Sequence, residues 1–130
     1  MAFEIPGFND GTRLAGADLS SHQHKFVKLN SSGAVILCAA VTDKPYGILQ
    51  DKPTSGQPAN VMLMGISKVV SAAGNTKGNP VGTDANGLAA EYVHGTDTTK
   101  YIVGEIIDDA DAANGVATIA FNCLGAGRAA

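Results

Sequence analysis

Residues 46–70, YGILQDKPTSGQPANVMLMGISKVV, hold the pattern that decides the fold. Two short apolar runs, 46–49 and 61–64, flank a loop, 51–59, that is rich in proline and glycine. Gly65 then allows a bend before a third apolar run. Short apolar runs separated by proline and glycine are typical of β-strands joined by loops. We therefore predict strand, loop, strand, bend and strand here, and the stretch carries no pattern typical of catalysis.

The rest of the chain repeats this arrangement of short apolar runs and turn residues. A hairpin is predicted from 25–29 and 34–40, joined by a turn at 30–33. The run AVILCAA at 34–40 is expected to be buried on both faces. The other expected strands are 88–93, 100–108 and 115–123, with an irregular loop at 71–82. About eight short strands and no amphipathic helix predict an all-β fold, a small antiparallel β-sandwich or β-barrel.

The last expected strand, 115–123, alternates regularly between two faces. The face expected in the core is apolar: Ala117, Ile119, Phe121 and Cys123. The face expected outside carries small or weakly polar side chains: Val116, Thr118 and Ala120. An outward face with so little charge can pack against a neighbouring protein, or it can simply be solvated.

Residues 1–20 have no sustained hydrophobic period, and three glycines and one proline interrupt them. Four apolar side chains are scattered along the segment: Phe3, Ile5, Phe8 and Leu14. Such a segment cannot bury enough apolar surface to order itself. It is either a frayed terminus or an extended N-terminal arm that places these side chains on a partner. We therefore divide the chain into an arm, 1–20, and a single β domain, 21–130.

Charged residues make up only 16% of the chain, against about 25% in ordinary globular proteins. So few charges suggest that a partner covers part of the surface, although a compact glycine-rich β domain would have the same composition. The net charge of −3 disfavours nucleic acid as a partner, because phosphate contacts need clustered lysine and arginine. No apolar run approaches the roughly 18 residues of a membrane span, and no signal peptide is visible.

The sequence offers only weak candidates for a chemical site. His22 and His24 could share a metal only with a third ligand. The acidic loop at 108–115 lacks the spacing of a calcium loop, and no GxSxG motif occurs. Cys38 and Cys123 lie in apolar strands, where burial raises a thiol pKa, and are expected as reduced core residues. We predict no enzyme activity, no catalytic residue, no metal and no cofactor.

Six landmarks follow one another in order between residues 26 and 123. They are the hairpin LNSSGAVILCAA, the segment DKPYGIL, the loop and kinked strand SGQPANVMLMGISKVV, the turn segment GNPVGTDANGL, the strand KYIVGEII and the last strand GVATIAFN. In this order they resemble the phage capsid cement, or head decoration, family of small β proteins. The resemblance covers about 100 of the 130 residues.

The resemblance implies a non-enzymatic structural protein. Members of the family bind the outer surface of the mature icosahedral head, commonly as trimers, and stabilise contacts between major capsid protein subunits. For this chain it implies the major capsid protein as partner, a homotrimer on the capsid, a place on the outside of the virion, and synthesis in the host cytoplasm. The alternatives are another virion structural protein of the tail or head completion, or a carbohydrate-binding β module.

Eight residues are the candidate contacts with the capsid or with other subunits. Four belong to the arm and four to the β domain: Phe3, Ile5, Phe8, Leu14, Tyr46, Met62, Met64 and Tyr101. Methionine adapts to irregular surfaces, which favours Met62 and Met64 as contacts. Packing in the core is the alternative for both methionines.

Overall fold

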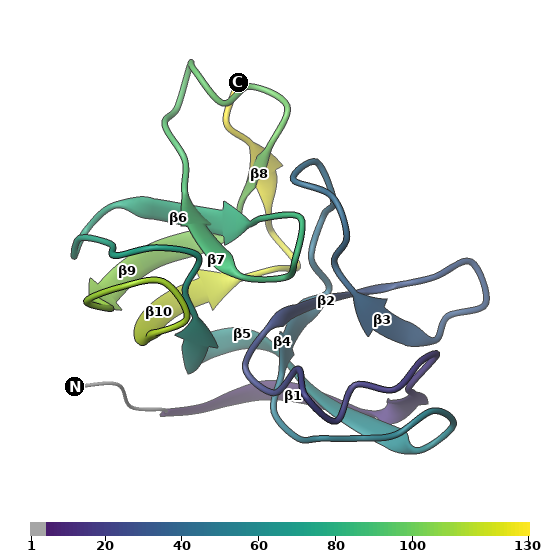
Figure 1. Cartoon of the computed structure of the whole chain (residues 1–130). Coiled ribbons are helices and arrows are strands. Elements are labelled where there is room, and N and C mark those ends of the chain that lie inside the picture. The colour runs from purple at the N-terminus through teal and green to yellow at the C-terminus, as the bar shows by residue number, and fades with distance from the viewer. Residues whose placement is uncertain (1–4) are drawn as a thin grey trace.

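The computed structural model describes residues 5–130, which form β-strands and loops and contain no helix (Figure 1). The strands are β1 (Ile5–Leu14), β2 (Phe26–Leu29), β3 (Val35–Leu37), β4 (Gly47–Leu49), β5 (Pro58–Val70), β6 (Pro80–Thr83), β7 (Ala89–Glu91), β8 (Tyr101–Ile102), β9 (Gly104–Asp108), β10 (Val116–Asn122) and β11 (Gly127–Arg128). Every pair of neighbouring strands is antiparallel. The predicted small antiparallel all-β fold is therefore confirmed.

Nine strands make one curled sheet (Figure 1). Eight of them follow the order β3-β2-β4-β5-β10-β9-β6-β7, and β1 pairs with β5 outside this path. The remaining two, β8 and β11, form a short ribbon of their own. β4 pairs with the first half of β5 and β10 with the second half, so β2, β3 and β4 lie toward the start of β5, and β6, β7, β9 and β10 lie toward its end (Figure 1).

The long strand β5 is bonded along both of its edges. Met62 is paired with Asn9 of β1 and also with Ile48 of β4. Met64 is paired with Phe8 of β1 and also with Asn122 of β10. A strand residue can pair with only one neighbour on each edge. It follows that β1 covers one edge of β5, while β4 and β10 share the other edge end to end.

The predicted bend at Gly65 is present, and it lies where Gly7 of β1 comes close to β5. Gly65 has φ = +137°, a conformation that residues with a side chain rarely adopt. A Cβ atom on Gly65 would also lie 3.1 Å from Cα of Gly7 in β1. The register between the two strands shifts on both sides of Phe8. These shifts are β-bulges, which bend a strand and change the side to which its residues point.

The change of side explains how β5 contributes to both cores. Met62 and Val69 pack in the same core cluster, although seven positions separate them and a regular strand would place them on opposite faces. The first cluster consists of Phe26, Cys38, Ile48, Met62, Val69, Val81, Ala89, Val103, Ile106, Ala110, Ala117, Ile119, Phe121 and Cys123. The second consists of Ala15, Leu19, Val27, Val35, Leu49, Ala59 and Val61. The predicted core face of β10 thus lies wholly in the first cluster.

The described part of the predicted arm is extended, as expected, and it is also a strand of the sheet. Beyond β1, the amide of Ala15 donates to the carbonyl of Gln57 at 2.8 Å, and that of Leu19 donates to Pro53 at 2.9 Å. Ala15 and Leu19 are buried in the second cluster. Residues 5–19 therefore pack against the same chain, while the division into an arm and a domain at residue 20 stays a prediction.

Three segments differ from the predicted strands, each for a local reason. The run 34–40 forms only β3, because the Asp43 carboxylate accepts hydrogen bonds from the amides of Ala39 and Ala40 and ends the strand. As an edge strand, β3 is not buried on both faces. The expected loop at 71–82 includes the start of β6. The expected strand at 100–108 divides into β8 and β9 at Val103, whose amide donates to Val81 in β6 at 2.9 Å.

Replacing Gly65 by alanine should destabilise the protein. We expect the free energy of unfolding to fall by about 1–3 kcal/mol. The alanine would have to keep a positive φ that is unfavourable for a residue with a side chain, and its Cβ would crowd Gly7 in β1. Gly11 in β1 is the matched control: a Cβ there would meet nothing within 4 Å, so Gly11→Ala should change stability by less than about 0.5 kcal/mol. Urea denaturation followed by circular dichroism measures both, and equal stabilities would contradict the bend as a constraint.

Candidate interaction surface

Strand pairing gathers exposed apolar side chains at the junction of β1 and β5. Ile5 is directly opposite Ile66, and Phe8 is directly opposite Met64. Across the other edge of β5, Ile66 is opposite Ala120 of β10. Residues directly opposite one another in a sheet point to the same face. We call Ile5, Phe8, Met64, Ile66 and Ala120 the β1–β5 patch.

The β1–β5 patch is open to solvent on the β1 side. Phe8 is 67% exposed and Ile5 is 50% exposed, while Met64, Ile66 and Ala120 are half-buried. Asn122 and Glu105, opposite Met64 and Ala120 respectively, give the patch a polar border. A cluster of apolar side chains with a polar border is typical of a surface that binds another protein.

The predicted outward face of β10 is only partly correct. Val116 is 43% exposed and Ala120 is half-buried, as expected of an outer face. Thr118 is fully buried instead. Lys68 of β5 and Asp108 of β9 are its partners in register, and their longer side chains flank it on the same face.

The eight predicted contacts do not form one site. Of the seven that the structure describes, it brings together Ile5, Phe8 and Met64, and it places Leu14, Tyr46, Met62 and Tyr101 apart. Leu14 is 52% exposed at the far end of β1, opposite Pro58. Met62 is 3% exposed and packs in the core, which was the alternative for it.

Two predicted tyrosine contacts have partners within the chain. Tyr101 is half-buried in the β8–β11 ribbon, with the Arg128 guanidinium 5.5 Å from the centre of its ring. Tyr46 is half-buried just before β4, and its hydroxyl donates to Asp10 of β1 at 2.5 Å. Phe3 lies outside the described residues. Ile66 and Ala120 belong to the patch but were not predicted as contacts, because only the strand register reveals their neighbours.

In addition to the pairing of β1 with β5, a hydrogen bond from Tyr46 to Asp10 joins β1 to the segment before β4. The Asp10 carboxylate also accepts hydrogen bonds from the hydroxyl and the amide of Thr12, at 2.5 and 2.8 Å, and lies 3.7 Å from Nε of Arg13. The bonds from Thr12 and then from Tyr46, with the Arg13 charge, lower the pKa of Asp10 to about 2. Burial, and then the neighbouring carboxylate, raises the pKa of Tyr46. At neutral pH, Asp10 is therefore ionised and Tyr46 keeps its proton.

The structure also describes the candidate metal ligands and the two cysteines. Within residues 5–130 no three His, Cys, Asp or Glu side chains are grouped closely enough to hold a metal ion. Cys38 and Cys123 are free and buried, as predicted. Burial raises the pKa of Cys38 to about 12, and it also raises the pKa of Cys123. Both thiols are therefore protonated at neutral pH. The described part of the chain has no helix long and apolar enough to cross a membrane.

Replacing Tyr46 by phenylalanine tests how β1 is attached. We expect the pKa of Asp10 to rise from about 2 toward its ordinary value of 3.8, because one of its hydrogen-bond donors is lost while Thr12 remains. Carbon-13 NMR of the carboxylate during a pH titration measures this shift. Tyr92→Phe is the control, since Tyr92 donates to the carbonyl of Thr83 and not to Asp10. An unchanged Asp10 pKa in Tyr46→Phe would contradict the bond.

The same bond makes stability depend on pH in a defined direction. The lowered pKa of Asp10 stabilises the fold above the unfolded value of 3.8, and this contribution is lost as the pH falls toward about 2. At pH 7, Tyr46→Phe should lower the free energy of unfolding by about 1 kcal/mol. The difference between the variant and the original chain should become smaller at pH 2. A difference that grows on acidification would contradict this assignment.

No protein-family model matches the chain, and none of the curated proteins searched matches it. Among solved structures, it is similar to the crystal structure of the head fiber gp8.5 N base in bacteriophage phi29. The TM-score is 0.63 at 14% sequence identity, and the match covers 89% of this chain and 92% of that chain. At such an identity the likeness concerns the fold. The chain thus shares almost its whole architecture with a protein of a phage head, and this likeness does not single out the cement family.

Proposed function

We propose that this chain is a structural protein of a bacteriophage virion that binds the outer surface of the head. The observation that carries the proposal is the fold likeness to a phage head fiber base over 89% of the chain. A match of this extent includes strands that precede β5 and strands that follow it, so it concerns the whole sheet and not one hairpin. The order of segments in the sequence, which resembles head decoration proteins, supports the same conclusion independently.

The β1–β5 patch is the surface we propose for attachment. Phe8 and Ile5 keep half or more of their side-chain area in solvent in the isolated chain. Covering such groups removes apolar area from water and favours association. The partner we propose is the major capsid protein, whose subunits the bound protein would hold together. Phe8 is the expected anchor, because aromatic residues at the centre of an interface carry much of its binding energy.

Stabilisation would follow from differential binding to two states of the head. A protein that binds the expanded shell more tightly than its precursor shifts the balance toward the expanded shell. Many copies act at once, so each needs only modest affinity. Binding as a homotrimer would add contacts between copies, and a specific interface of this kind buries on the order of 800 Å² on each partner.

A second candidate is the base of an appendage that projects from the head. The likeness to the N base of a phage head fiber favours this alternative. In that case the chain would attach to the head in the same way but would also carry another polypeptide. Electron microscopy of virions would show rods extending from its position, whereas a decoration protein would form compact knobs.

Co-sedimentation with phage heads that lack this protein tests the proposal. The chain should pellet with expanded heads and remain in the supernatant with precursor heads. Phe8→Ser should weaken binding about tenfold, a loss of about 1.4 kcal/mol. Val93→Ser is the matched control, because Val93 is 61% exposed but lies outside the patch.

Two outcomes would separate the parts of this proposal. If the original chain does not bind expanded heads, the attachment function is wrong. If it binds and Phe8→Ser binds equally well, the function stands and the β1–β5 patch is not the attachment surface. Circular dichroism of both variants establishes that they are folded.

A further inference from the structure

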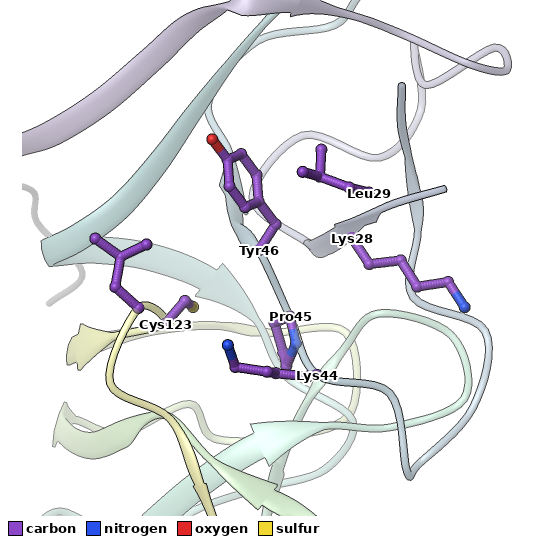
Figure 2. A pocket seen from close by; sticks show the side chains of 7 residues that line it. Lys28, Leu29, Lys44, Pro45, Tyr46 and Cys123 are labelled. Atoms are coloured by element: carbon purple, nitrogen blue, oxygen red, sulfur yellow. The ribbon is translucent and has the colours of Figure 1, made fainter. Parts of the chain in front are cut away.

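A hollow of about 220 Å³ lies between the segment that leads into β4 and the chain that follows β10 (Figure 2). Lys44, Pro45 and Tyr46 line one side, and Cys123 and Leu124 line the other. Lys28 and Leu29 of β2 complete it. It shares no residue with the β1–β5 patch, so it is a separate feature of the surface.

The charged groups that line the hollow are both cations. No carboxylate lines it, although the chain as a whole has a net charge of −3. Nζ of Lys28 is already paired with Asp43 at 2.9 Å. Lys44 is exposed and has no ion pair within the part of the chain that the structure describes. The uncompensated charge in the hollow is therefore that of Lys44.

The charge of Lys44 acts on Cys123, another residue that lines the hollow. Burial is the main cause of the raised pKa of Cys123, and the nearby Lys44 cation acts in the opposite direction. Cys123 is 1% exposed, so it forms a buried part of the lining. Lys44 itself is exposed, so an anion that pairs with it gains the modest energy of a partly exposed ion pair.

The rest of the lining is apolar. Leu124 is 57% exposed, and Leu29 and Tyr46 are half-buried. Pro45 is buried and closes the wall between Lys44 and Tyr46. The hydroxyl of Tyr46 is held by Asp10, so its ring presents an apolar surface of fixed position. An apolar wall beside one free cation fits a ligand that combines a carboxylate with an apolar side chain.

We propose that this hollow binds an acidic and apolar segment of a partner polypeptide. Its carboxylate would pair with Lys44, and its neighbouring apolar side chain would pack against Leu29, Tyr46 and Leu124. A nucleic acid fits less well, because a single free cation cannot neutralise several phosphates. The proposal does not depend on attachment to a phage head, since it rests on the lining alone.

A peptide titration tests this assignment. The probes are acetyl-Leu-Glu-Leu-amide and its neutral counterpart acetyl-Leu-Gln-Leu-amide, added to the nitrogen-15-labelled chain. The Glu peptide should shift the amide signals of Lys28, Leu29, Lys44 and Leu124. It should also bind about threefold more tightly than the Gln peptide, the effect of one partly exposed ion pair. Salt should reduce this difference.

Two variants separate the hollow from general charge effects. Lys44→Gln should bind the two peptides equally, while Lys52→Gln should keep the preference, because Lys52 is an exposed lysine outside the hollow. Leu124→Ser should weaken both peptides. The proposal is overturned if the shifts lie elsewhere, if the original chain does not prefer the Glu peptide, or if Lys44→Gln keeps that preference. Because no phage head is used, these outcomes are independent of the head-binding assay.

Discussion

The whole architecture depends on hydrogen bonding along both edges of β5. This strand pairs with β1 on one edge and with β4 and β10 on the other, so it connects the strands before it with those after it. A regular strand of this length would keep each face on one side of the sheet. The bulge between Met62 and Met64, beside the bend at Gly65, changes that, and it lets Val61 enter one core cluster and Val69 the other. Gly7 of β1 lies close to Gly65, so a side chain at Gly65 would crowd β1 at the bend.

Local patterns in the sequence predicted a large part of this fold. The alternation in 115–123 identified β10 and its core face, and Gly65 marked the bend, because both depend on neighbouring residues in the chain. The strand β1 was not predicted, since residues 5–14 have no hydrophobic period of their own. They become a strand through pairing with residues more than forty positions away. Leu19 is held by another long-range contact, the hydrogen bond from its amide to the carbonyl of Pro53, and it is buried in the second cluster.

The interaction surface shows the same limit. Met62 and Met64 are two positions apart, and a regular strand would place both on one face. Met62 is nevertheless in the core, while Met64 is half-buried at the surface. The bulge between them decides this, and no sequence pattern reveals a bulge without the partner strand. Similarly, Ile5 and Phe8 were recognised as apolar anchors, but their neighbours Ile66 and Ala120 became evident only from the register. The two proposed binding surfaces also differ in kind, since one is apolar and the other combines Lys44 with an apolar wall.

The pairing of β1 with β5 has a consequence for synthesis of the chain on the ribosome. Ile5 cannot meet its partner Ile66 until the 61 residues after Ile5 have been added. At about 5–20 residues per second this takes roughly 3–12 s. During that time Ile5 and Phe8 have no sheet to lie on, while the β2–β3 hairpin can already close from local contacts. The nascent N-terminal segment is therefore the part of this protein that most needs protection from premature association.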